Sequence, residues 1–424
     1  MMNPESIQDT VNPSNSKSNL QPDFFSSTLD FVCIDTETTG LFPDKDDIIE
    51  VAAVKYQHGR QVAVYNSFAK PTKPVPHYIE YLTKISTKEL EKAPSISKVL
   101  SELKAFVQDF VIVGQNTRFD LDFINTKLAE KSELPLINNW WDTSEISRIY
   151  LPYTTDHKLS TLCEYFGIEL NNAHRAINDA IATAELFIKL ADYMFKNHGL
   201  TVNARIYELS LQAQLESSLS LLLERIVTQQ RRFALIGTRP KEKPFISYNV
   251  IENKCLNPIV FNQNDIFQSD GILQRNFEQF EFRVGQLDMA NSVEKAFRES
   301  SFLIVEAGTG VGKSFAYLIP ALQFAYLHKA KIVISTNTKN LQEQLFTKDI
   351  PLLKQILQIP FKAVLVKGRE NYICERRWEE LMLEQTRGLT SYEAAALLHL
   401  LIWKQNTNTG DLSENSSFDR NRFS

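Results

Sequence analysis

Three strand-like segments follow one another between residues 31 and 68, and they constrain the fold of this 424-residue chain more than any other feature. The first is the short apolar run FVCID, and the next two flank a turn at His58-Gly59-Arg60. Apolar runs bounded by turn residues predict strands, the last two joined as a hairpin. From Ser97 the apolar spacing becomes that of helices, with a buried strand, VIVGQN, between two of them. We therefore expect an α/β fold, a mixed sheet covered by helices.

The rest of the chain divides into a polar start, a connector and a glycine-rich block. Residues 1–28 are rich in Asn, Ser and Pro and lack the pattern of a secretory signal, so we expect a disordered tail. The first domain spans residues 29–197. Residues 198–272 predict a connector with one long helix, and residues 273–424 an incomplete α/β lobe. In that lobe FLIVEAGTGVGKS predicts strand, loop and helix, and AKIVISTNT predicts a second strand.

Composition narrows the class of protein. A hydrophobic content of 43% and a charged content of 23% are ordinary for a globular protein, and no apolar run approaches the roughly 20 residues that span a bilayer. The net charge of −5 gives no overall basic surface, so contact with nucleic acid would depend on local positive patches or bound metal. Four cysteines without a CxxC pair fit a reducing compartment. We expect a soluble cytoplasmic protein with no membrane partner.

Acidic residues form three clusters in the first domain. Asp35 and Glu37 lie two residues apart at the end of the first strand, so their side chains point to the same face. Carboxylates there repel each other unless a cation lies between them, and Mg²⁺ prefers such oxygen ligands. Asp120 follows in GQNTRFDLDF, and His174 and Asp179 follow in AHRAINDA. A third and a fourth carboxylate converging on one cleft would complete a two-metal site.

In order and spacing these motifs resemble those of the DnaQ-like exonucleases, in the subclass that has four acids and a histidine. The resemblance covers roughly residues 29–195 and implies a ribonuclease-H-like fold with two bound Mg²⁺ or Mn²⁺ ions. The metal ligands that it implies are Asp35, Glu37, Asp120 and Asp179. It also implies that His174 is the general base for an attacking water, and that a 5′-mononucleotide leaves from the 3′ end.

The same resemblance implies substrate contacts outside the acidic clusters. Thr38 would help to recognise the terminal 3′-hydroxyl, Leu41 would wedge against the last base, and Asn116 would help to order the site. Gln115 departs from the family pattern, which often has His at this position, but it is not a metal ligand. Asp142 matches no ligand position, and we interpret it as structural.

The third block carries a nucleotide-binding motif. AGTGVGKS, residues 307–314, fits the Walker A pattern in its strand–loop–helix context. Successive backbone amides would hold the phosphates, Lys313 would reach the β- and γ-phosphates, and Ser314 would bind Mg²⁺. The predicted ATP-binding residues are Ala307, Gly308, Thr309, Gly310, Val311, Gly312, Lys313, Ser314, Arg283 and Gln286.

Segments around this motif resemble superfamily-2 helicases. Arg283 and Gln286, in FEFRVGQLDMA, are similar to the adenine-reading segment of these helicases. An exonuclease domain followed by such segments, over about residues 275–424, resembles the DinG-type helicases that carry a fused exonuclease. No DEAH-type box follows Ser314, so we expect ATP binding without hydrolysis or unwinding by this chain alone. Cys374 stands where some relatives place the first ligand of an iron–sulfur cluster, but no cysteine follows it, and we expect no cluster.

These observations predict a 3′→5′ exonuclease that acts on single-stranded 3′ ends of DNA and carries an ATP-binding lobe. Two alternatives stay open. An RNA-trimming exonuclease of the same fold would use the same motifs, although the helicase-like block favours DNA. An ATP-responsive DNA-binding protein with a silent nuclease site belongs to another class, and the presence of all five catalytic residue types argues against it.

Overall fold

The computed structural model describes residues 25–170, 174–236, 250–253, 260–277, 280–308, 310, 312–383 and 388–418. The chain divides into two compact units. The first comprises Met1–Phe245, Ile373–Thr407 and Asp411–Ser424, and the second comprises Ile246–Tyr372 and Asn408–Gly410. Within the described ranges, no helix is both long enough and apolar enough to cross a membrane.

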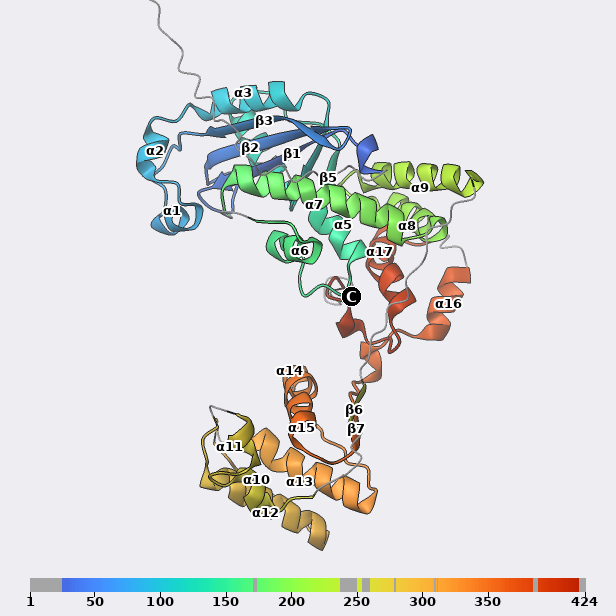
Figure 1. The fold of residues 1–424 in the computed structure, drawn as a ribbon. Coiled ribbons are helices and arrows are strands. Elements are labelled where there is room, and N and C mark those ends of the chain that lie inside the picture. The colour runs from blue at the N-terminus through green and yellow to red at the C-terminus, as the bar shows by residue number, and fades with distance from the viewer. Residues whose placement is uncertain are drawn as a thin grey trace, which may run out of the picture. The chain divides into compact units, whose positions relative to one another are not determined.

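The first unit is built on a five-stranded sheet of order β3-β2-β1-β4-β5 (Figure 1). Its strands are β1 (Phe31–Thr38), β2 (Ile48–Gln57), β3 (Arg60–Phe68), β4 (Val111–Gly114) and β5 (Trp140–Asp142). β2 is antiparallel to both β1 and β3, whereas β4 and β5 continue the sheet parallel to β1. This mixed sheet, covered by helices, confirms the predicted α/β class.

Helices cover both faces of this sheet (Figure 1). α7 (Ala176–Asn197) lies across one face, where its apolar side chains share a core with Phe31. α3 (Ile96–Val107) and α4 (Thr117–Glu130) cover the opposite face, where Val32 belongs to a second core. Successive side chains of a strand point to opposite faces, so β1 contributes to both cores and is the buried centre of the unit.

The first unit contains further helices. They are α1 (His77–Thr83), α2 (Thr87–Glu91), α5 (Thr143–Tyr150), α6 (Leu159–Phe166), α8 (Leu200–Ala213), α9 (Leu219–Ile236), α16 (Glu375–Leu383) and α17 (Ser391–Asn406). The one long helix predicted in the connector is instead the pair α8 and α9. The helix breaks because Gln214 adopts a left-handed backbone, with φ 50°, and Ser218 then donates its N–H to the carbonyl of Trp140 at 2.8 Å.

Two packing features differ from the domain boundaries that the sequence predicts. Phe25 is fully buried and stacks on Phe195 with 5.2 Å between ring centroids, so folded structure begins within the tail expected at residues 1–28. Residues 1–24 lie outside the described part of the chain. α17 packs on α8 and α5, and its buried Leu398 joins the core of the first unit. The helices after residue 373 therefore fold with the first unit, because their apolar sides are buried there.

The second unit is mainly helical. Its described elements are α10 (Gln263–Phe267), α11 (Ile272–Asn276), α12 (Val284–Glu299), α13 (Lys313–His328), α14 (Lys339–Gln344), α15 (Ile350–Ile356), and the antiparallel strands β6 (Val250–Asn253) and β7 (Phe361–Val364). α12 packs on α13, and buried residues of both helices belong to one core with α10 and α15. Residues 263–267 form α10, and Asn262 caps this helix by accepting the N–H of Asp265 at 2.9 Å.

The two strands predicted on either side of the Walker A helix are not formed. Residues 301–308 and 331–335 have no strand assignment, and Phe302, Ile304 and Val333 are 105%, 97% and 90% exposed. A parallel strand needs hydrogen-bonding neighbours along its edges, and none of the described residues pairs with these segments. That prediction was therefore wrong for the described structure, although both segments are apolar enough for a buried strand.

Candidate active site

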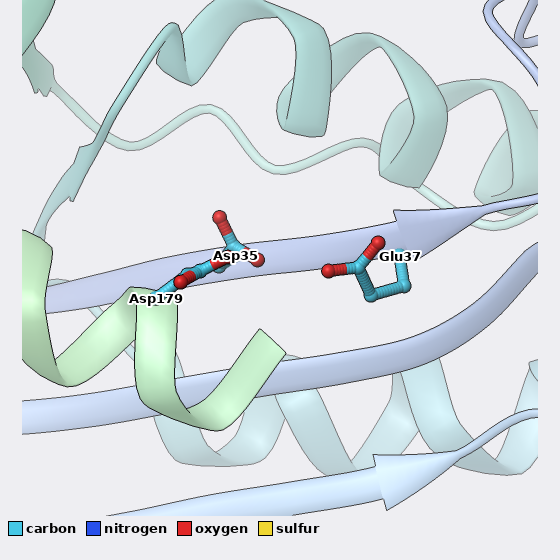
Figure 2. Close-up of side chains that lie close together, drawn as sticks. All are labelled: Asp35, Glu37 and Asp179. Atoms are coloured by element: carbon cyan, nitrogen blue, oxygen red, sulfur yellow. The ribbon is translucent and has the colours of Figure 1, made fainter. Parts of the chain in front are cut away.

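Three carboxylates meet at the carboxyl end of β1 (Figure 2). Asp35 and Glu37 project from β1, and Asp179 comes from the first turn of α7. One oxygen from each of the three lies within 4.8 Å of the others. The spacing of two residues on a strand predicts the shared face of Asp35 and Glu37, and α7 adds the third acid from the helix that covers that face.

Asp120 lies beside this cluster. It is in the first turn of α4 and is 4% exposed. Its Oδ1 accepts the backbone N–H of Thr36 at 2.9 Å and the hydroxyl of Thr36 at 2.7 Å. Its negative charge helps to raise the pKa of Asp35, so the two carboxylates interact. The four acids that the sequence singles out therefore come to one place, three of them with oxygens in direct proximity.

Burial and mutual repulsion raise the pKa of each acid. Burial, followed by the charges of Asp179 and other acids, raises the pKa of Glu37 to about 8. Burial raises the pKa of Asp120 to about 7 against the hydrogen bonds from Thr36. For Asp35 and Asp179 the pKa is also raised, mainly by burial. These shifts mean that a cluster of ionised carboxylates is costly here unless a positive charge joins it.

The donor set fits a divalent cation. Oδ1 of Asp179 is buried and has no hydrogen-bond partner among the described residues, so one oxygen at the centre of the cluster is available for another ligand. All the converging atoms are carboxylate oxygens, which are the ligands preferred by Mg²⁺ and Mn²⁺. The acids nearest to one another, Asp35, Glu37 and Asp179, could hold such an ion.

His174 precedes α7 and has an exposed side chain. Its backbone is left-handed, with φ 68°, and its N–H donates to Oδ2 of Asp179 at 3.0 Å. Burial raises the pKa of Asp179, and this hydrogen bond and the charge of His174 oppose that rise. The predicted general base thus lies next to the acids with its ring open to solvent.

Glu50 is a buried acid that the motif spacing does not single out. It is fully buried on β2, directly opposite Glu37 on β1. Its carboxylate accepts two hydrogen bonds from the guanidinium of Arg175, each at 3.2 Å, and the N–H of Ala176 at 3.2 Å. Because Ala176 begins α7, Glu50 ties that helix to the sheet beside the acidic cluster. The sequence does contain one indication of this role. Glu50 is a charged residue inside the apolar run IIEVAAV, and a buried charge needs a partner.

Asp142 organises the end of β4. Asn116 is exposed and left-handed, with φ 66°, and its N–H donates to Oδ1 of Asp142 at 3.0 Å. Asp142 also accepts the N–H of Thr117 at 3.2 Å and that of Ser144 at 2.8 Å. These bonds fix the starts of α4 and α5, in agreement with a structural role for Asp142.

A buried histidine holds the segment that follows α17. His157 is 5% exposed, and its ring nitrogens lie 3.0 Å from the hydroxyl of Ser147 and 2.9 Å from that of Ser417. Gln115, the departure from the family pattern, donates to the carbonyl of His157 at 2.7 Å. Burial, with the nearby charge of Arg148, lowers the pKa of His157 to about 4, so the ring is neutral near pH 7.

The loop after β1 presents two apolar side chains to solvent. Thr38 donates its hydroxyl to the carbonyl of Gly40 at 2.7 Å, and Asp46 accepts the N–H of Phe42 at 2.9 Å. With the loop fixed in this way, Leu41 is 73% exposed and Phe42 is 57% exposed. Leu41, expected to wedge against a base, therefore lies at the surface on the loop that follows the two acids of β1.

The Walker A loop leads into α13. Gly310 and Gly312 have φ values of 83° and 80°, which are available to glycine without strain. The ammonium of Lys313 donates to the carbonyl of Ala307 at 2.9 Å, across the loop where phosphates would lie. Gly308, before the loop, and Ser314, which follows Lys313 in α13, both belong to the described part of the chain. Two other predicted residues, Thr309 and Val311, lie outside the described part of the chain.

Arg283 and Gln286 contact this loop. Gln286 donates its side-chain amide to the carbonyl of Gly312 at 2.9 Å, and Arg283 donates to the carbonyl of Gly310. Both residues are therefore placed next to the predicted nucleotide site, where they hold its backbone.

Comparison with known families identifies both parts of the chain. Residues 32–187 match the family model described as an exonuclease, and residues 288–408 match that of the DEAD/DEAH box helicases. Two separate stretches of the chain thus match an exonuclease family and a DEAD/DEAH box helicase family, in the order in which the motifs occur.

The chain also matches part of longer curated proteins. The 3′-5′ exonuclease DinG of Bacillus subtilis is 31% identical over 397 residues, which are 91% of this chain and 41% of that protein. Its namesake from Staphylococcus epidermidis is 32% identical over 396 residues, or 91% of this chain and 42% of the relative. The chain therefore spans about two fifths of the length of these curated relatives.

Solved structures of exonucleases are more distant. Exonuclease I of E. coli in complex with a dT13 oligonucleotide overlaps 41% of this chain and 45% of its own, at 20% sequence identity and a TM-score of 0.36.

Proposed function

We propose that the first unit is a metal-dependent 3′→5′ exonuclease that releases 5′-mononucleotides from single-stranded 3′ ends of DNA. The observation that carries this proposal is the meeting of Asp35, Glu37 and Asp179 within 4.8 Å in a domain that matches an exonuclease family. The polarity is supported by the relatives named 3′-5′ exonuclease. The helicase domain on the same chain favours DNA over RNA.

The four acids, Asp35, Glu37, Asp120 and Asp179, would hold two Mg²⁺ or Mn²⁺ ions. Such ions, when bound, lower the pKa of a water and stabilise negative charge on the phosphate and leaving oxygens. His174 accepts the proton of the attacking water as general base. The water oxygen bonds to phosphorus as the bond to the 3′ oxygen breaks, and that oxygen takes a proton from solvent. The raised pKa values of the acids support this assignment, because added positive charge would offset the repulsion among them.

Residues around the acids would position the 3′ end. In this proposal Thr38 contacts the terminal 3′-hydroxyl, Leu41 wedges against the last base, and Asn116 orders the site. The exposure of Leu41 supports its part, because a wedge must be free to touch a base.

The second unit would bind ATP through residues 307–314, with Arg283 and Gln286 beside the nucleotide. The proposal for this unit is limited to ATP binding, because it rests on the Walker A residues. We place the protein in the cytoplasm, since Cys33 and Cys163 are buried free thiols of the kind that a reducing compartment maintains.

The test is release of mononucleotides from 5′-labelled single-stranded DNA with Mg²⁺ or Mn²⁺. We expect a ladder that shortens from the 3′ end and disappears in Asp35→Ala, Asp179→Ala and His174→Ala. Asp122→Ala is the matched control, because Asp122 is a half-exposed acid of α4 that pairs with Arg118 outside the cluster.

Full cleavage by Asp179→Ala would contradict the site. Faster shortening of a matched RNA oligomer would favour the RNA-trimming alternative. ATP binding without release of nucleotides from either polymer would favour a DNA-binding protein with a silent nuclease site.

A further inference from the structure

Two tyrosines on α1 expose most of their surface to solvent. Tyr78 is 64% exposed and Tyr81 is 88% exposed, and residues three apart on a helix lie on the same side. Ile79 and Thr83, on the opposite side of α1, are buried. Within the described residues, neither tyrosine side chain makes a hydrogen bond or a ring contact. Exposed aromatic side chains gathered on one helix are the usual mark of a binding surface.

The helix that carries them is firmly held. Ile79 and Ile85 pack with Ile49 of β2 in a small core of their own. The carboxylate of Glu80 accepts the N–H of Thr87 at 2.8 Å, which joins α1 to the start of α2. The two rings are therefore displayed on a fixed support, as a platform for a flat ligand requires.

This surface belongs to the same end of the sheet as the acidic cluster. Ile49, under α1, is the neighbour of Glu50, which pairs across the strands with Glu37. Figure 1 shows α1 and α2 at the end of the sheet where α7 begins. A nucleic-acid strand with its 3′ end among the acids must leave over a neighbouring surface, and α1 provides one.

Lysines connect α1 to the loop that carries Leu41. The ammonium of Lys73, just before α1, donates to the carbonyl of Lys45 at 3.1 Å, and Lys45 lies 5.2 Å above the ring of Phe42. Asp47, in the same loop, accepts the N–H of Thr72 at 2.7 Å. The two lysines thus lie where the loop that carries Leu41 meets the segment just before α1, in a protein whose net charge is −5.

We propose that Tyr78 and Tyr81 stack on bases of single-stranded DNA upstream of its 3′-terminal nucleotide, while Lys45 and Lys73 face the phosphates. The proposal rests on the exonuclease function above, which puts the 3′ end at the acids. Aromatic rings stack on any base, so this surface would guide a strand without reading its sequence. The lysines supply the local positive charge that the chain as a whole lacks.

The test separates binding along the strand from chemistry at its end. Affinity for a long 5′-fluorescein oligothymidylate is measured by anisotropy in an Asp35→Ala background, so that the DNA is not consumed. Tyr78→Ala/Tyr81→Ala is expected to weaken this affinity at least about tenfold, whereas Tyr78→Phe/Tyr81→Phe retains it. With Asp35 intact, the Ala pair keeps the wild-type kcat/KM on the p-nitrophenyl ester of thymidine 5′-monophosphate, which has no upstream bases. Lys73→Ala is expected to reduce the slope of log affinity against log salt concentration by about 1, which corresponds to the loss of one phosphate contact.

Each outcome bears on one claim. Unchanged oligomer affinity in the Ala pair would overturn the stacking surface, as would a Phe pair that binds as weakly as the Ala pair. An unchanged salt slope in Lys73→Ala would overturn the phosphate contact. Failure of the wild-type chain to hydrolyse both the ester and DNA would overturn the exonuclease function, and the anisotropy data would still decide the role of the tyrosines.

Discussion

The pairing of Glu50 with Arg175 predicts how much the first unit depends on one ion pair. Arg175→Ala leaves the fully buried carboxylate of Glu50 with the N–H of Ala176 as its remaining partner. Removing one member of a buried pair costs about 3 to 5 kcal/mol, because the other charge stays buried without compensation. The side chain of Arg175 is 30% exposed, so we expect the lower end, a loss of about 3 kcal/mol in the free energy of unfolding.

Urea unfolding followed by tryptophan fluorescence measures this loss for the first unit alone. Every tryptophan of the sequence lies in that unit: Trp140, Trp141, Trp378 and Trp403. Arg175→Lys keeps the charge but not the two-pronged contact, so an intermediate loss is expected. The double variant Glu50→Leu/Arg175→Met removes both charges and should recover most of the stability lost in Arg175→Ala.

Activity should fall in the same variant for a geometric reason. Arg175 lies between His174 and the start of α7, which carries Asp179, and a displacement of about 1 Å at a reacting group can cost about a hundredfold in rate. The charge of Arg175 also lowers the pKa of Glu37, so its loss makes ionisation of that acid harder. We expect kcat on DNA to fall about tenfold to a hundredfold in Arg175→Ala. An unchanged urea midpoint together with an unchanged kcat would refute this reasoning, and a double variant as unstable as Arg175→Ala would show that packing matters more than charge.

Three further predictions concern other parts of the chain. Burial lowers the pKa of His157 and of His198 from 6.5 to about 4, so the stability that these neutral rings contribute is complete above about pH 6.5 and is lost as the pH falls through 4. Urea midpoints at pH 7 and pH 5 should accordingly differ less in His157→Gln than in the wild type; an equal difference would exclude His157 as a source. Asp142→Ala removes the acceptor of three backbone N–H groups and should cost about 3 kcal/mol in the same urea assay, with a loss below about 1 kcal/mol contradicting the structural role. Lys313→Ala should abolish binding of a fluorescent ATP analogue and leave basal DNA cleavage unchanged, and retained ATP binding would count against the Walker A assignment.

Features that depend on local spacing could be predicted from the sequence. The shared face of Asp35 and Glu37 follows from the two-residue period of a strand, and α7 follows from its apolar periodicity. His174 lies just before that helix and has a left-handed backbone. The catalytic roles of these residues stay predictions until cleavage is measured.

Features that depend on distant partners could not be predicted in the same way. In the sequence, Glu50 is one charged residue within an apolar segment. Only the folded structure shows that Arg175, 125 residues further along the chain, contacts it. The burial of Phe25 depends on Phe195, which stacks on it from the end of α7. The strand predicted at residues 301–308 is not formed, although its residues strongly prefer a strand. A local preference is not enough, because a strand also needs a neighbouring strand to pair with.

Those unpaired segments have a practical consequence for work with this chain. Phe302, Ile304 and Val333 expose apolar side chains on segments that have no strand partner among the described residues, and another copy of the chain can pair with such segments. Association of this kind grows with protein concentration and with time, and apolar contacts strengthen it on moderate warming. We therefore expect turbidity to limit the duration and the protein concentration of a nuclease assay with this chain.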